Sequence, residues 1–152
     1  MSVVPAPDET RADELREPQE HIGFLIRRAQ QVHVATWTRV VSPEISSVQY
    51  SILAVIDRRG EVSQRELGDE IDLDRSTIGD LVARMERHGL ITRRRDVQDG
   101  RRNTVTLTPH GLAERRRLYP LVVQAQDELV GSLDAADRTA LRRALTRMLT
   151  GT

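Results

Sequence analysis

The stretch SQRELGDEIDLDRSTIGDLVARMERHG, residues 63–89, decides the fold of this chain. Ser63 stands three residues before Glu66, a spacing typical of the cap that opens a helix, and the spacing predicts a short helix over residues 64–71. A tight turn follows, and Asp74 at its end is suited to cap a second helix. Two short helices joined by a turn of three or four residues form a helix-turn-helix.

The second helix, predicted over residues 75–88 and ended by Gly89, carries apolar and polar residues on different faces. An α-helix fits the major groove of DNA, where side chains at its N-terminal end can contact base edges. A helical pair with a solvated polar face would show the same pattern, so this stretch alone leaves both interpretations open. The residues predicted to be buried are Ile78, Leu81, Val82 and Met85, and those predicted to contact bases are Arg75, Ser76, Thr77 and Arg84.

The next residues change from helical to strand-like periodicity. Two strand-like segments, 90–94 and 103–107, flank a loop with Asp99-Gly100 at its tip, and this arrangement predicts a β-hairpin. A hairpin that directly follows a helix-turn-helix is a wing, and its cationic side chains would contact the DNA backbone and minor groove. The hairpin carries five arginines, Arg93, Arg94, Arg95, Arg101 and Arg102, which solubility alone hardly explains.

Helices are also predicted on both sides of this region. From Pro18 to just before Ser42-Pro43, apolar residues recur at spacings of three and four and predict a long amphipathic helix. A second helix begins with the capping pair Ser46 and Gln49 and closes near Gly60. The stripe of the first helix consists of Ile22, Ile26, Ala29, His33, Trp37 and Val40.

After the hairpin, Thr108-Pro109 opens a helix that we expect to reach about Leu133, with a kink at Pro120. A last helix is predicted from the cap Asp134 onward, with Leu141, Leu145 and Met148 on one side. Terminal helices this apolar on one side need a partner surface.

Composition excludes several classes of protein. The 152 residues have a formal net charge of zero, yet residues 84–102 carry seven arginines against three acids, which is the local charge expected where phosphate is bound. The absence of cysteine excludes disulfides, thiolate metal sites and cysteine nucleophiles. The four histidines have no metal-ligand spacing and no convergent acid–base pair is apparent, so we expect no enzyme, no metal and no cofactor.

No apolar run is long enough for a membrane span, and the start of the chain lacks the order of a secretion signal. These features predict a cytoplasmic protein, here one associated with the nucleoid. Residues 1–17 contain two prolines and many charges, and we expect them to be a disordered acidic arm.

Several motifs also resemble the signature of the MarR family of bacterial transcription regulators. They are ELG at 66–68, LDRST at 73–77, LVARMERHGLI at 81–91, DGRR at 99–102 and VTLTPHG at 105–111. The resemblance spans about residues 18–150, and one departure is Asp96-Val97, where the family usually has Asp-Pro. The resemblance implies a homodimer in which the terminal helices of the two subunits interlock and each recognition helix enters a major groove. It also implies that a wing-tip arginine, here Arg101 oriented by Asp99, enters the minor groove.

On this basis residues 18–152 are expected to form one mainly α domain, with dimerisation helices at 18–45 and 109–152 around a winged lobe at 46–108. The expected function is sequence-specific binding of double-stranded DNA, as a repressor of a near-palindromic operator with half-sites about 10 bp apart. A protein-interaction module using the same fold is the alternative. The missing cysteine argues against a peroxide-sensing member of the family.

A second group of residues suggests a small-molecule effector. Arg27, His33 and Trp37 lie on the first predicted helix, and together they offer a guanidinium for a carboxylate, an imidazole for a hydroxyl and an aromatic wall. The string from Leu25 to Gln31, followed by His33 and Trp37, is similar to that of MarR-like repressors that respond to phenolic carboxylates. A cluster at the dimer interface, in a regulator without an effector, would explain the same residues.

Overall fold

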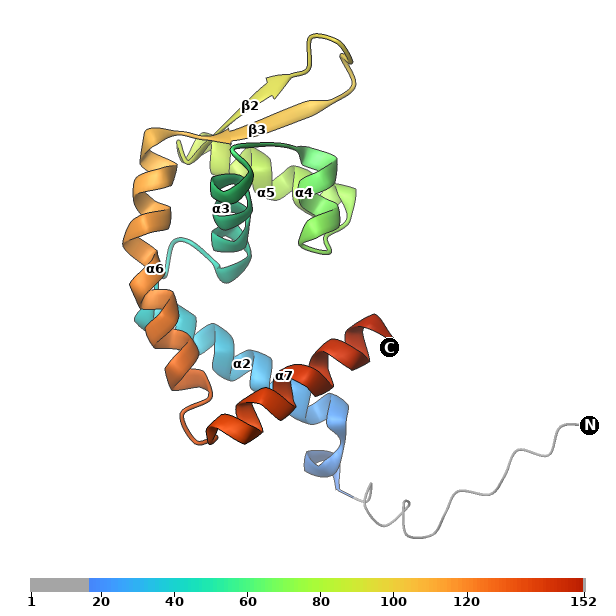
Figure 1. Cartoon of the computed structure of the whole chain (residues 1–152), viewed down its shortest axis with the longest axis vertical. Coiled ribbons are helices and arrows are strands. Elements are labelled where there is room, and N and C mark those ends of the chain that lie inside the picture. Colours follow the sequence, from blue (N-terminus) through green and yellow to red (C-terminus); the bar gives the residue numbers. More distant parts are fainter. Residues whose placement is uncertain (1–16, 152) are drawn as a thin grey trace, which may run out of the picture. The chain divides into compact units, whose positions relative to one another are not determined.

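A computed structural model describes residues 17–151 of the chain (Figure 1). By their contacts, these residues divide into one unit that ends at Ala35 and a second that begins at Thr36, and each is described by itself. The elements are η1 (Pro18–Glu20), α2 (Ile22–Val40), α3 (Ser47–Arg59), β1 (Glu61–Ser63), α4 (Gln64–Glu70), α5 (Arg75–Arg87), β2 (Ile91–Arg95), β3 (Asn103–Leu107), α6 (Pro109–Leu129) and α7 (Ala135–Thr150).

The first unit contains η1 and most of α2. The expected helix from Pro18 is interrupted, because His21 has an extended backbone and separates a single 3₁₀ turn from α2. Large apolar side chains of the predicted stripe, Ile22 and Ile26, are exposed in the single chain. The expected arm at residues 1–17 lies outside the described residues except for Glu17, and the single-domain assignment stays a prediction.

The second unit has its core among α3, α4, α5, the sheet and the first part of α6. Ile52, Leu53 and Ile56 of α3 are fully buried, since this helix packs against both the sheet and α6. Three of the four residues predicted to be buried on α5, Ile78, Val82 and Met85, are buried, and Leu81 is half-buried. The burial explains why α5 is fixed against β2 and presents its remaining faces to solvent.

The wing is the hairpin β2–β3, in which Ile91 pairs with Leu107 and Arg95 with Asn103 (Figure 1). It belongs to a three-stranded antiparallel sheet in the order β1-β3-β2, because Glu61–Ser63 pairs with the outer side of β3. The sequence predicted two strands and missed β1, since three residues are too few for an alternating pattern to be recognised. The winged helix-turn-helix and the mainly helical fold are confirmed.

The predicted caps set the helix boundaries. Ser46 and Gln49 form a complete capping box on α3, and Asp74, Thr108 and Asp134 each accept a backbone N–H in the first turn of their helices. α6 runs through Pro120 as one helix and ends at Leu129, earlier than the predicted Leu133. Among residues 17–151 no helix is long and apolar enough to cross a membrane.

Candidate nucleic-acid interface

The N-terminal turn of α5 presents Arg75, Ser76 and Thr77 to solvent. Asp74 fixes this end of the helix, since its Oδ1 accepts a hydrogen bond of 2.7 Å from the Thr77 backbone N–H. Hydrogen bonds from Thr77 and Ser76 hold the pKa of the Asp74 carboxyl below its usual value. Because the free N–H groups at this end carry partial positive charge, the turn favours a nearby phosphate.

Three of the five wing arginines, Arg94, Arg95 and Arg101, are exposed and form no ion pair with any described residue. The tip is shaped by Asp99, whose side chain accepts the Arg101 backbone N–H at 3.1 Å and whose carbonyl accepts that of Arg102 at 2.9 Å. Asp99 thus orders the backbone around Arg101 and leaves the Arg101 guanidinium exposed.

The other two wing arginines are paired with acids of the same chain. Arg93 lies 3.3 Å from Glu86 of α5, and Arg102 lies 2.6 Å from Glu66 of α4. In the free protein these two guanidinium groups therefore face acids of the same chain, and the positive charge of the wing that is unpaired within the described residues is concentrated at Arg94, Arg95 and Arg101.

A groove of about 850 Å³ lies between α4, the start of α5 and the wing tip. It is lined by four arginines and three acids, so both signs of charge are present and positive charge is in slight excess. Sequence reasoning missed Arg65, whose only signal was its place in the first turn after the Ser63 cap. The charged lining residues are Arg65, Arg75, Arg101, Arg102, Glu66, Asp69 and Asp99.

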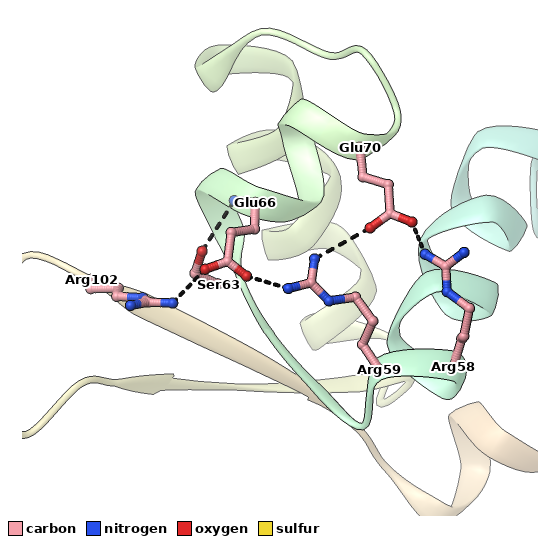
Figure 2. Close-up of polar contacts among 6 residues, drawn as sticks. All are labelled: Arg58, Arg59, Ser63, Glu66, Glu70 and Arg102. Atoms are coloured by element: carbon pink, nitrogen blue, oxygen red, sulfur yellow. Dashed lines mark hydrogen bonds and ion pairs between the residues drawn. The ribbon is translucent and has the colours of Figure 1, made fainter.

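A chain of alternating charges connects α3 with the wing through α4 (Figure 2). Glu70 pairs with Arg58 and Arg59 at the end of α3, while the two carboxylate oxygens of Glu66 each accept a hydrogen bond of 2.6 Å, from Arg59 and from Arg102. Burial opposes ionisation of Glu66, but the bonds from Arg59 and Ser63 and the charge of Arg102 outweigh it and lower the pKa of this carboxyl.

The predicted effector residues differ in their surroundings. Arg27, in the first unit, is exposed and its guanidinium lies 5.1 Å from the centre of the Phe24 ring, and His33 is half-buried. Trp37, in the second unit, is buried, donates its indole N–H to the Ile45 carbonyl at 2.7 Å and packs against Tyr50. Among the described residues, no group of three or more His, Asp or Glu is arranged to hold a metal ion.

Comparison with known proteins places this arrangement in a family. Residues 45–102 match the MarR family model. The repressor NicR of Pseudomonas putida is 31% identical over 131 residues, which are 86% of this chain and 83% of NicR. The chain belongs to the MarR family of transcription regulators.

Many solved structures are similar over most of the chain, and PcaV and BpsR are two examples. PcaV of Streptomyces coelicolor, in complex with its natural ligand, is 35% identical with a TM-score of 0.85, over 88% of this chain and 95% of PcaV. BpsR of Bordetella bronchiseptica, whose DNA binding is regulated by 6-hydroxynicotinic acid, is 28% identical with a TM-score of 0.77, over 84% of this chain and 97% of BpsR.

Proposed function

We propose that this regulator binds operator DNA as a homodimer and represses transcription until a small aromatic carboxylate releases it. The observation that carries the DNA-binding part is the exposed cationic surface formed by the first turn of α5 and the wing tip. The residues expected to contact base edges are Arg75, Ser76, Thr77 and Arg84. Those expected to contact phosphates or the minor groove are Arg94, Arg95 and Arg101. Arg93 and Arg102, which are paired with acids of the same chain, would lie next to these contacts.

Salt titration of operator binding tests the role of the wing tip. The affinity falls as salt rises, and each phosphate contact adds about 0.9 to the steepness of log affinity against log salt. Arg101→Ala should therefore weaken binding and make the slope less steep by about one. Arg143→Ala is the matched control, because Arg143 is an exposed arginine of α7 on the face opposite Leu141 and Leu145. Equal slopes for both variants would remove Arg101 from the interface.

The partner for dimerisation would cover the exposed apolar residues of the terminal helices. On α7, Leu141, Leu145 and Met148 recur at spacings of four and three and are 41%, 39% and 52% exposed. Such a stripe is typical of a helix that packs against another helix. Sedimentation should give the mass of a dimer, and a monomer at micromolar concentration would contradict the proposed geometry.

The effector is proposed from Arg27, His33 and Trp37, with support from the aromatic acid that regulates BpsR. A ligand can release DNA only through a difference in its affinity for the DNA-binding and the released arrangement. Calorimetric titration with phenolic acids and 6-hydroxynicotinic acid should show binding that Arg27→Ala reduces. Arg28→Ala is the control, since Arg28 is the neighbouring exposed arginine and contacts Gln31.

A MarR-like regulator without an effector would bind the operator but none of these acids. A module that binds only proteins would fail to retard its own upstream region in a gel shift even at low salt, where phosphate contacts are strongest.

A further inference from the structure

Among residues 17–151, a single side chain bonds the loop at the tip of the wing to an element outside the hairpin. The ladder between β2 and β3 ends with Arg95 opposite Asn103, and within residues 96–102 the hydrogen bonds are internal to the turn. In the described part of the chain, the bond from Arg102 to Glu66 is the only hydrogen bond or ion pair that ties this loop to another element.

Glu66 is itself held firmly from two sides. Its backbone N–H donates to the buried Ser63 hydroxyl at 3.1 Å, and Ser63 pairs with Thr104 of β3, two residues beyond Arg102. Its Oε2 accepts the Arg59 guanidinium at the end of α3. The backbone of Glu66 is therefore bonded to the residue that ends β1, and its carboxylate is bonded to α3 independently of the wing.

The same carboxylate is turned away from its usual capping contact. A glutamate three residues after a serine cap often accepts the backbone N–H of the capping residue, as Gln49 does for Ser46. The two oxygens of Glu66 instead accept Arg59 and Arg102, both at 2.6 Å (Figure 2). The Glu66 side chain thus bonds to Arg102, 36 residues later in the sequence, and not to the backbone N–H of the residue that caps its own helix.

We propose that Glu66 is a positioning residue of the DNA-binding surface, whose carboxylate fastens the wing loop to α4 through Arg102. Arg102 then orients the loop, and Arg101, the exposed neighbour with no ion pair to a described residue, contacts the DNA. This division of roles rests on the proposed DNA-binding function.

Hydrogen exchange in the free protein tests the fastening without DNA. Glu66→Gln and Arg102→Gln should each speed exchange of the amides in residues 96–102 by about two- to fivefold, the range expected for loss of one exposed ion pair. Glu70→Gln is the matched control, because it removes a carboxylate of the same charge chain that contacts Arg58 and Arg59 but not the wing. Unchanged exchange in both wing variants would overturn the proposal.

Operator binding then separates positioning from direct contact. We expect Glu66→Gln and Arg102→Gln each to weaken binding by about two- to fivefold, the double variant to be no weaker than either, and the salt slope to stay within half a unit. If Glu66→Gln tightened binding, or Arg102→Gln lowered the slope by about one, Arg102 would be a phosphate contact and the assignment would be wrong. A wild-type protein that binds no DNA would refute the proposed function, while the exchange experiment would still decide whether Glu66 holds the loop.

Discussion

Gly111 in the first turn of α6 packs directly on the backbone of Leu90. A Cβ atom at Gly111 would lie 1.9 Å from the Leu90 carbonyl oxygen, far inside any allowed contact. Thr108 enforces the approach, since its hydroxyl donates to the Gly89 carbonyl and accepts the Gly111 N–H, while its backbone N–H donates to Leu90. The Thr-Pro-His-Gly motif therefore locks the start of α6 to the entry of the wing.

We expect Gly111→Ala to lower the free energy of unfolding by at least about 2 kcal/mol, because the backbone of Leu90 must move. Chemical denaturation followed by Trp37 fluorescence measures the loss. Gly23→Ala is the control, since a Cβ atom at Gly23 of α2 would meet no other atom within 4 Å and the variant should be neutral or slightly stabilising. Equal stability of the two variants would contradict the close contact.

The second prediction concerns Arg115, which donates from Nη1 to the Tyr50 hydroxyl at 2.7 Å and stacks on the rings of Tyr50 and Tyr119. Burial raises the pKa of Tyr50, and the positive charge of Arg115 partly opposes this rise. Tyr50→Phe keeps the ring and removes the acceptor, so it should cost about 1 kcal/mol of folding free energy.

Tyr119→Phe provides the comparison, because Tyr119 is 56% exposed and its hydroxyl has no hydrogen bond to a described residue. Denaturant midpoints of the two variants should differ, with Tyr50→Phe the lower. A Tyr50→Phe protein as stable as Tyr119→Phe would show that the bond from Arg115 contributes nothing.

The parts of the fold that local chemistry determines were predictable from the sequence. Side-chain caps are encoded within four residues, so Ser46, Asp74 and Thr108 located the helix starts correctly. The hairpin was predictable because Asp99-Gly100 separates two strand-like runs. Family resemblance then supplied the expected role of each element.

Contacts between distant residues could not be predicted in this way. β1 pairs with β3 more than forty residues later in the chain, and no local period marks it. The ion pair of Glu66 with Arg102 likewise joins α4 to the wing, and the sequence did not show that Arg93 and Arg102 face acids of the same chain. Charge counted along the chain does not reveal which arginines are already paired.

The last prediction concerns the loss of folding stability at low pH. A hydrogen bond from Arg117 holds the pKa of Glu114 below its usual value, and one from Arg39 does the same for Glu128. A carboxyl whose pKa is lower in the folded than in the unfolded protein stabilises the fold at pH values above its unfolded pKa. That contribution is lost as pH falls from about 4.5 through the lower pKa of the folded state, so stability should decline in this window.

Denaturation at pH 7, 5, 4 and 3.5 measures this dependence, and Glu114→Gln should reduce it because the side chain at position 114 then has no proton to gain. Glu61→Gln is the matched control, since the Glu61 carboxylate forms no ion pair with a residue of the described chain, and it should leave the acid slope as in the wild type. If Glu114→Gln and the wild type lost stability in parallel below pH 4.5, the bond between Glu114 and Arg117 would not be formed in solution.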